Sequence, residues 1–570
     1  MLAYDVVVVG AGGAGMMAAL SASEDESLKV ACISKIFPTR SHTGAAQGGI
    51  NAAMGYRDST DSPEKHFKDT VKGSDFLADQ DAVEFFTTKM PEVISELDYY
   101  GVPFSRDGNG NIAQRPFGGA SSPRTCYSAD KTGHVILHSI YEQCLKKEVD
   151  FFDEWFLLSL VVEDSSFTGL VVMNIKTGEI VPIKAKSVVI ATGGFGRIYW
   201  NRTTNALNMT GDGTAACFNI GIPLKDPEFV QFHPTGLAST GVLLSEACRG
   251  EGGYLLNKDG ERFMARYAPE KMELGPRDLV SRSIETEIKE GRGFGEGMDS
   301  YVLMDLRHLG KKKIMERLPQ VRELAMEFEG VDMLEEPVPI RPSCHYMMGG
   351  IHVINPETLS TQIEGIHAAG ECACVSLHGA NRLGGNSVAD VVLFGKYAGI
   401  GARETAHRRS YGSETKLNQE AQVWNKKFET IRNKKTGKNI VDIRNKMAQT
   451  MWDNVGIFRK EEEMATALKE INQLIKDYKD TYIGDPAVRY NMAFVNYVEI
   501  GNLLDLAKGV VMAALNRKES RGSHSRGDYQ TRDDANFLAH TLVHKRENDD
   551  YELEYIQVKI TKYQPEERKY

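Results

Sequence analysis

A short apolar strand followed at once by a glycine-rich turn restricts the fold of this chain more than any other feature. Residues 4–9 form a largely β-branched run, and residues 10–15 read G-A-G-G-A-G. A helical stretch at 16–23 and a second apolar strand at 28–34 complete a βαβ unit. In such a unit the glycines allow a tight turn, and the helix N-terminus faces a pyrophosphate. The pattern predicts an α/β Rossmann-like domain that binds a dinucleotide.

The identity of the dinucleotide is indicated by a position that departs from the usual pattern. The acidic residue expected about 20 positions after the turn, where it binds ribose hydroxyls, is replaced by Ser34 and Lys35. Because a hydroxyl can still make that hydrogen bond, the departure weakens the case for NAD more than the case for FAD. Two later strands, at 187–192 and 365–369, also end at glycines. Both are predicted to close around the same dinucleotide.

The separation of these strands makes the predicted FAD-binding domain discontinuous. The insertion mixes strand and helix patterns, which favours an α+β capping domain over the flavin. Farther along, Met464, Leu468 and Ile471 begin an apolar face at helical spacing in a highly charged region, which indicates a helical domain. The predicted domains are FAD-binding at 1–235 and 348–410, capping at 236–347, helical at 411–515 and a small C-terminal domain at 516–570.

Length, charge and composition exclude several classes of fold, ligand and partner. At 570 residues the chain is too long for a single core, and its net charge of −10 argues against nucleic acid as a partner. The 8 cysteines lack the spacing of a disulfide scaffold or a zinc site, so reduced thiols and no metal are expected. No apolar stretch reaches the roughly 18–20 residues that span a bilayer. A strand that opens at residue 4 leaves no room for a signal peptide, which indicates a prokaryotic, cytosol-facing protein.

Polar residues flanked by Gly and Pro recur at the predicted domain junctions, where ligand pockets tend to form. Taken alone, each is better explained as a surface salt bridge or a satisfied buried histidine. Their recurrence favours a pocket for a dicarboxylate, because two carboxylates need charge-assisted donors. The candidate donors are His233, Ser245, His345 and Arg382. Ser387 would open an apolar helix at 388–400, whose positive end can stabilise negative charge on a reduced flavin.

Several short motifs carry a resemblance to a known family. In chain order they read R-S-H-T, Q-F-H-P-T-G, C-R-G-E-G-G, G-P-R-D, H-Y-M-M-G-G, H-G-A-N-R-L-G and R-G-S-H-S-R-G-D-Y. From end to end, the chain resembles the flavoprotein subunit of succinate dehydrogenase and fumarate reductase, the respiratory complex II family. The resemblance implies interconversion of succinate and fumarate by hydride transfer with covalently bound FAD.

The resemblance also implies roles for individual residues. His42 matches the histidine that carries 8α-linked FAD. Arg277 matches the residue that exchanges a proton with the substrate, and Glu246 and Arg249 match its relay. Because arginine, with a pKa above about 12, stays protonated, the role of Arg277 as a base comes from the resemblance alone. The matches to the carboxylate-binding groups are His233, Ser245, His345 and Arg382. The residues predicted to contact FAD are Gly10, Gly12, Gly13, Ala14, Gly15, Ser34, Lys35, Ser41, His42, Thr43, Gly48, Gly49, Gly193, Asp212, Glu371, Arg382 and Ser387.

Partners are implied in the same way. The sequence holds no cysteine set for an iron–sulfur cluster, yet electrons must leave FAD through one-electron carriers. The resemblance therefore implies a separate iron–sulfur subunit and a membrane anchor that handles quinone. Association with the cytoplasmic face of the cell membrane would then be peripheral and held by these partners.

Two alternatives stay open at this point. An enzyme on the same scaffold, such as L-aspartate oxidase or the flavin subunit of adenylylsulfate reductase, typically lacks histidine at the position of His42. A flavin-binding module without turnover would not need Arg277, Glu246, Arg249 and Arg382 together.

Two positions depart from the pattern of many relatives. Ser245 stands where many relatives have Thr, and its hydroxyl keeps the binding function. Gln47 resembles succinate-oxidising members, whereas quinol-linked fumarate reductases often have Glu there. The physiological direction is open, and a fumarate reductase remains an alternative.

Overall fold

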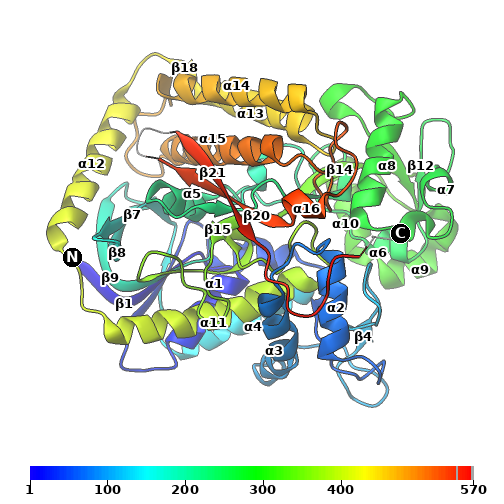
Figure 1. The fold of residues 1–570 in the computed structure, drawn as a ribbon, viewed down its shortest axis with the longest axis horizontal. Helices are drawn as coiled ribbons and strands as arrows, with labels where there is room; N and C mark the ends of the chain where they lie inside the picture. The colour runs from blue at the N-terminus through cyan, green and yellow to red at the C-terminus, as the bar shows by residue number, and fades with distance from the viewer. Residues whose placement is uncertain (547–549, 567–570) are drawn as a thin grey trace.

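Within residues 1–546 and 550–566, which the computed structural model describes, a seven-stranded sheet forms the centre of the molecule (Figure 1). Its order is β6-β2-β1-β9-β8-β7, and β16 also pairs with β9. The pairs among β6, β2, β1, β9 and β16 are parallel, whereas β8 is antiparallel to both neighbours. These strands are β1 (Leu2–Val9), β2 (Val30–Ser34), β6 (Asp150–Asp153), β7 (Trp155–Glu163), β8 (Ser166–Asn174), β9 (Ile180–Ile190) and β16 (Ile366–Ala368). The parallel core confirms the predicted α/β fold.

Two helices pack tightly on this sheet. They are α1 (Gly13–Ala22) and α11 (Asn386–Arg408), and a Cβ atom on Gly399 of α11 would lie 2.2 Å from the carbonyl oxygen of Ala18 in α1. Both helices begin earlier than the sequence predicts, because glycine and asparagine at their first turns weaken the local helix pattern. Around them lie α2 (Pro63–Gly73), α3 (Gln80–Tyr99), α4 (Thr132–Lys146), α5 (Asp212–Asn219), and the short strands β3 (Ile50–Asn51), β4 (Gln114–Arg115) and β5 (Thr125–Cys126).

A separate antiparallel sheet with its own helices projects to one side, drawn in green in Figure 1. The strand order is β11-β14-β13-β12, and the apolar residues between this sheet and its helices form a cluster of their own. Its elements are β11 (Val230–Leu237), β12 (Tyr254–Leu256), β13 (Val302–Asp305), β14 (Val338–Met347), α6 (Ala247–Gly250), α7 (Met264–Tyr267), α8 (Arg277–Lys289), α9 (Gly310–Arg317) and α10 (Pro319–Glu329). Because β11 runs across residue 235, this strand joins the cap to the central unit. The exact domain division stays a prediction.

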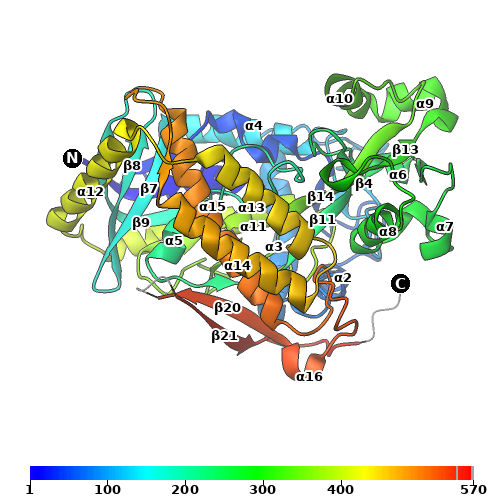
Figure 2. The same cartoon turned by 90° about the horizontal axis from the view of Figure 1, so that it is seen from above.

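Long helices cover another face of the molecule. α13 (Ile440–Val455), α14 (Glu461–Tyr478) and α15 (Met492–Asn516) lie side by side, and α12 (Glu414–Asn433) contacts α15, with the ring centroids of Phe428 and Phe494 4.6 Å apart (Figure 2). In α14, Met464, Ala467, Ile471 and Leu474 are buried, which confirms the predicted apolar helix face. Unlike α14, α15 is apolar on most of its sides because it lies between the other helices and the central unit.

The C-terminal part of the chain returns to the central unit. The hairpin of β20 (Ala539–Lys545) and β21 (Tyr551–Gln557) pairs through β20 with β10 (Leu224–Lys225), in a sheet that also holds β15 (Gly350–His352) and β17 (Ala373–Cys374). Beyond the hairpin, the Gln80 side chain accepts backbone N–H groups at 561–563. Among the described residues, no helix combines the length and the apolar character needed to cross a membrane.

Candidate active site

A cavity of about 720 Å³ opens at the carboxyl ends of β1, β2 and β9. In open α/β sheets, ligands bind outside the carboxyl ends of the strands, at the point where the order of the strands in the sheet reverses. The glycine turn, the loop around His42, and a group of Arg and His side chains from the cap and its edges all line the cavity. A single cavity thus joins a dinucleotide-type turn to a cluster of charged side chains.

The glycine turn is held against the sheet by contacts that leave no space for a Cβ atom. Gly10 has a φ of +108°, and a Cβ there would lie 2.2 Å from the carbonyl oxygen of Ala191. A Cβ on Gly15 would lie 1.7 Å from the carbonyl oxygen of Gly10, so α1 packs directly on the turn. Gly12 precedes α1 and has no side chain to cap it, which leaves N–H groups of the first turn for an anion. The turn therefore fits the pyrophosphate of FAD.

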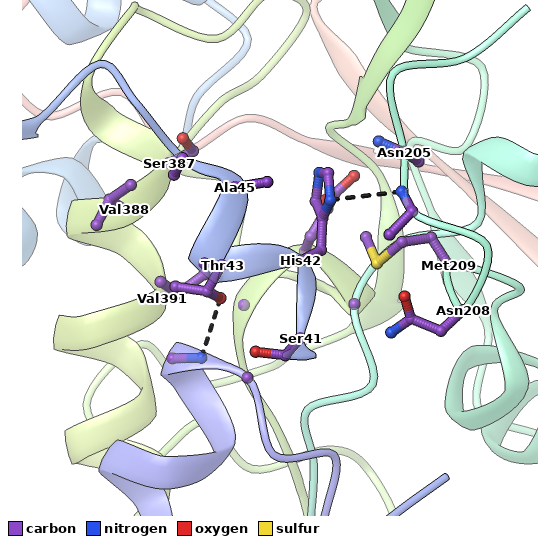
Figure 3. Close-up of a pocket in the computed structure, with 18 of the residues that line it drawn as sticks. Ser41, His42, Thr43, Ala45, Asn205, Asn208, Met209, Ser387, Val388 and Val391 are labelled. Atoms are coloured by element: carbon purple, nitrogen blue, oxygen red, sulfur yellow. Dashed lines mark hydrogen bonds between the residues drawn. The ribbon is translucent and has the colours of Figure 1, made fainter. Parts of the chain in front are cut away.

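The loop that carries His42 lies against this turn (Figure 3). Thr43 Oγ1 accepts a hydrogen bond from the backbone N–H of Gly13 at 3.0 Å, which ties the loop to α1. The His42 ring points toward the segment 205–209, and its Nδ1 accepts the N–H of Ala206 at 3.4 Å. Burial, with a smaller contribution from a nearby guanidinium, lowers the pKa of His42 to about 4. The ring is therefore neutral, as an imidazole must be to act as a nucleophile.

Three guanidinium groups meet beside one carboxylate at the cap side of the cavity. Arg277 Nε and Nη2 both lie 2.7 Å from Glu246 Oε2. Arg249 Nη2 lies 3.8 Å from the same oxygen, and Arg249 Nη1 donates to the Glu273 carbonyl oxygen at 2.7 Å. Arg382 Nη2 donates to Gln231 Oε1 at 2.9 Å, and this is the oxygen that Arg277 Nη1 approaches to 3.4 Å.

This cluster carries more positive charge than its own residues neutralise. Glu246 pairs with two of the three guanidiniums, and Glu371, the other carboxyl that acts on Arg382, has a pKa that burial raises to about 7, so positive charge predominates. Arg249 and Arg382 are buried, and the Nε of each has no hydrogen-bond partner among the described residues. Burial, and then the charge of Arg277, lowers the pKa of Arg382 to about 10, so the group stays charged at neutral pH. Such a site has both the charge and the free donors to bind an anion.

Two histidines lie beside the guanidiniums. The rings of His233 and His345 have centroids 5.0 Å apart. His233 Nδ1 accepts the backbone N–H of Thr235 at 3.2 Å, and His345 Nδ1 lies 2.8 Å from Thr204 Oγ1. Burial and the charge of Arg277 hold the pKa of both histidines well below the usual range. Both rings are therefore neutral and can donate hydrogen bonds without adding further charge.

The cavity gathers nearly all of the residues predicted from sequence. Ser245 lines it, and its Oγ accepts the N–H of Ala247 at 3.3 Å. Gly15 does not line the cavity because it packs on the turn, and Arg249 lies behind Glu246. The others that line it are Gly10, Gly12, Gly13, Ala14, Ser34, Lys35, Ser41, His42, Thr43, Gly48, Gly49, Gly193, Asp212, His233, Glu246, Arg277, His345, Glu371, Arg382 and Ser387.

Comparison with known proteins places the chain in a family. A family described as "FAD binding domain" matches residues 5–388, and one described as "Fumarate reductase flavoprotein C-term" matches residues 444–570. The 8-methylmenaquinol:fumarate reductase flavoprotein subunit of Wolinella succinogenes is 49% identical over 99% of this chain and 92% of its own length. The succinate dehydrogenase flavoprotein subunit of Rickettsia bellii is 45% identical over 98% of this chain and 96% of its own.

A solved structure agrees with the sequence relatives. E. coli quinol fumarate reductase FrdA, solved as a point mutant, has a TM-score of 0.95 to this chain at 41% identity, covering 100% of this chain and 99% of that one. The chain belongs to the family of succinate dehydrogenase and fumarate reductase flavoprotein subunits. Membership in this oxidoreductase family confirms the predicted resemblance and FAD as the cofactor.

Two residues of this flavoprotein site were not predicted from the sequence. Gln231 brings Arg277 and Arg382 together through one amide oxygen. Its place two residues before His233 on β11 was a usable signal, because alternate residues of a strand share a face. Tyr346 lies under Arg382, with the guanidinium 4.4 Å from the ring centre, and its position next to His345 gives no such signal.

Proposed function

We propose that this chain interconverts succinate and fumarate by hydride transfer between the dicarboxylate and FAD. One observation carries the proposal: Arg277 and Arg382 line the same cavity as the FAD-binding turn, and positive charge predominates in their surroundings. A dicarboxylate dianion supplies negative charge to this site and accepts hydrogen bonds from guanidinium groups that line it, of which Arg382 has an Nε without a partner among the described residues. Neither an uncharged substrate nor a nucleotide cofactor alone would use this excess.

The chain's own residues would bind and orient the substrate. Arg382, His233, His345 and Ser245 are the proposed carboxylate-binding groups, and all four line the cavity. FAD, when bound, supplies the hydride acceptor for succinate oxidation and the donor for fumarate reduction. Substrate binding to buried donors excludes water from the reacting carbons.

Arg277 is the proposed proton donor to the substrate carbon during fumarate reduction. Its contacts with Glu246 at 2.7 Å connect it to a carboxylate that can return the proton, and Arg249 continues the path. Although burial alone would raise the pKa of Glu246, the charges of Arg277 and Arg249 lower it. An ionised Glu246 holds Arg277 in place and accepts its proton in the reverse direction, in which Arg277 takes a proton from succinate.

Helix α11 is the proposed source of electrostatic stabilisation for the flavin. The helix begins at Asn386, and Ser387, Val388 and Val391 of its first turns line the cavity. The N-terminal end of a helix carries partial positive charge, so it would favour the negative charge that a reduced flavin carries.

We also propose that FAD is attached covalently through an 8α linkage to His42. The support is a neutral, half-buried imidazole in the loop that contacts the glycine turn. In-gel flavin fluorescence after denaturation and acid treatment tests this, followed by mapping of the flavin-bearing peptide. Release of all FAD into the supernatant contradicts the covalent linkage. That result leaves the proposed succinate and fumarate activity unaffected.

The electron partners are proposed from the relatives. The printed names of the Wolinella succinogenes and E. coli relatives refer to quinol, which supports a quinone-linked complex with an iron–sulfur subunit and a membrane anchor. Peripheral attachment to the cytoplasmic face of the membrane follows from that proposal. Fractionation of native cells tests it, since the flavoprotein should sediment with membranes and leave them after chaotrope treatment. Recovery in the soluble fraction without partners contradicts the proposal.

The deciding experiment for the activity is anaerobic addition of succinate to the oxidised flavoprotein. Loss of the visible flavin absorbance with succinate, and its return with fumarate, supports the reaction in both directions. Bleaching by L-aspartate alone would favour the L-aspartate oxidase alternative. No bleaching by either compound would favour a flavin-binding module without turnover. The ratio of the two turnover rates, measured with an artificial dye, assigns the preferred direction.

A further inference from the structure

The end of β2 carries no carboxylate in this chain, and the structure supplies one from elsewhere. Lys35 follows β2, and its Nζ lies 2.6 Å from Asp212 Oδ2, 2.8 Å from Glu499 Oε1 and 2.5 Å from Thr210 Oγ1. Asp212 begins α5, whereas Glu499 belongs to α15 and lies 464 residues from Lys35 in the sequence. Lys35 therefore gathers two carboxylates at the point where a Rossmann-like fold binds ribose hydroxyls.

Helix α15 contributes a second side chain to the same point. Asn502 Nδ2 donates to Asp212 Oδ1 at 3.1 Å, so both carboxylate oxygens of Asp212 are held. Glu499 and Asn502 are three residues apart and hence lie on the same face of the helix. Because most of α15 is buried among apolar side chains, this polar pair is an exception within the helix.

The charges of the cluster favour hydrogen-bond donors from a ligand. Only 16% of the Lys35 side chain, 6% of Asp212 and 13% of Glu499 is exposed. Although burial alone would lower the pKa of Lys35, the charges of Asp212 and Glu499 raise it, so the ammonium stays charged. Lys35 and Asp212 line the cavity, whereas Glu499 lies behind them. Asp212 is the carboxylate of this cluster that lines the cavity, and carboxylate oxygens are the acceptors that sugar hydroxyls need.

We propose that Glu499 and Asn502 are positioning residues for FAD: by holding Lys35 and Asp212 they complete the ribose site and couple cofactor binding to the docking of α15. Glu499 shares the ammonium of Lys35 with Asp212, so Asp212 keeps part of its negative charge. Asn502 fixes the rotamer of Asp212 through its own hydrogen bond. FAD at this site in turn restrains α15 through the same contacts. The proposal depends on FAD binding alone and does not depend on the dicarboxylate reaction.

The test measures FAD binding and helix protection in matched variants of the full chain. All variants are made with His42→Ala, so that binding is reversible whether or not His42 carries FAD. Glu499→Gln removes the charge of the proposed residue. Asp505→Asn is the control, since Asp505 lies on the same helix, pairs with Lys545 at 2.7 Å and does not line the cavity. Asn502→Ala tests the second contact.

Titration with FAD and hydrogen exchange of residues 492–516, with and without FAD, are the two measurements. We expect Glu499→Gln to weaken FAD binding about tenfold or more and to abolish the FAD-dependent slowing of exchange in α15. Asn502→Ala should act in the same direction but less strongly, and Asp505→Asn should match the parent in both measurements.

Three results would overturn the proposal. One is FAD affinity of the Glu499→Gln variant within about twofold of the parent. Another is exchange in α15 that does not respond to FAD in the parent. The third is a fall in the unfolding temperature of the FAD-free Glu499→Gln variant as large as the fall in its FAD-bound form, which would mean a structural role only.

Discussion

Two clusters of arginine in this molecule differ in how far their guanidinium groups are paired with acceptors of the chain. In the C-terminal part, Arg517 is fully buried and each of its five N–H donors has an acceptor: Glu228, Glu519, the carbonyl oxygens of Phe537 and Ala539, and Thr541. Arg521 bonds Glu519 through two nitrogens and Asp534 through one of them, so these two guanidiniums face three carboxylates. At the cavity, Glu246 is the one carboxylate among the described residues that forms an ion pair with Arg277 or Arg249, and Arg382 forms none.

The difference separates a structural cluster from a ligand-binding one. Burying a charge is unfavourable unless partners and hydrogen bonds compensate it, and the guanidinium of Arg517 meets that condition within the chain, although Glu228 Oε2 has no partner among the described residues. The cavity cluster leaves guanidinium nitrogens without partners and an excess of positive charge, so its compensation has to come from a ligand. Arginine therefore stabilises the fold in the C-terminal cluster and provides a ligand-binding site in the cavity.

The largest expected effect is on turnover at the cavity cluster. Arg277→Ala removes the proposed proton donor, and we expect turnover to fall about 10²–10⁴-fold while substrate still binds. The unfolding midpoint should change little, because the excess positive charge is reduced. Steady-state kinetics measure turnover, and substrate-induced changes in the flavin spectrum measure substrate binding. Lys289→Ala, on the exposed end of the same helix, is the control, and turnover of Arg277→Ala within about tenfold of the parent would refute the assignment.

The opposite outcome is expected at the C-terminal cluster. Arg517→Met leaves Glu228 buried without its partner, and we expect about 3–5 kcal/mol of destabilisation in chemical denaturation. Kinetic constants of the remaining folded protein should be unchanged. The same substitution at Arg546, which forms an exposed ion pair with Glu552, should cost about 1 kcal/mol or less. Equal losses at the two positions would contradict the comparison.

Histidines in the two regions should respond oppositely to pH. His540 lies 2.6 Å from Asp226 and 3.0 Å from Asp79; burial alone would lower its pKa, but Asp226 raises it. A raised folded-state pKa contributes stability that is fully present below the unfolded value of about 6.5 and is lost as pH rises through the folded value.

Substitution of His540 should therefore matter most in acid. We expect His540→Gln to destabilise by about 1–3 kcal/mol at pH 6 and by less at pH 9, as measured by urea denaturation at both pH values. His233 in the cavity, whose pKa burial and Arg277 lower, should give no such gain in stability on acidification. If the destabilisation caused by His540→Gln were larger at pH 9 than at pH 6, the raised pKa of His540 in the folded protein would be refuted.

The smallest effect concerns one hydroxyl of the cavity. Ser245→Thr keeps the hydroxyl, so KM for the dicarboxylate should stay within about twofold, whereas Ser245→Ala should raise KM about tenfold, because a hydrogen bond to a charged group contributes about 1.5–3 kcal/mol. Parallel initial-rate measurements on the two variants compare them directly. An unchanged KM for Ser245→Ala would remove Ser245 from the binding groups.

The sequence predicted those parts of the site that depend on local pattern. The glycine turn, the strand before it and the α14 helix face follow from spacing within a few residues, and the structure confirms them. The early start of α1 was missed because glycine has a low intrinsic helix propensity, which tertiary packing overrode.

Contacts between distant residues were not predictable in this way. Ser34 and Lys35 were correctly noted as lacking the usual carboxylate, but no local signal points from Lys35 to Glu499, which is a charged residue on a long helix. The contacts of Arg517 were equally hidden, since Glu228 lies 289 residues away and two further bonds go to Ala539 and Thr541 in the C-terminal hairpin. Gln47 lines the cavity with an Oε1 that has no partner among the described residues, and its role in direction stays a prediction.

The docking of β20 on β10 has a consequence for biosynthesis. Asp226, beside β10, accepts the backbone N–H of Thr541 in β20, which leaves the ribosome 315 residues later. Until then one edge of β10 has no partner from the described C-terminal hairpin, and unpaired edges recruit other strands. The two residues of β10 therefore gain this neighbour only after residue 541 has been synthesised.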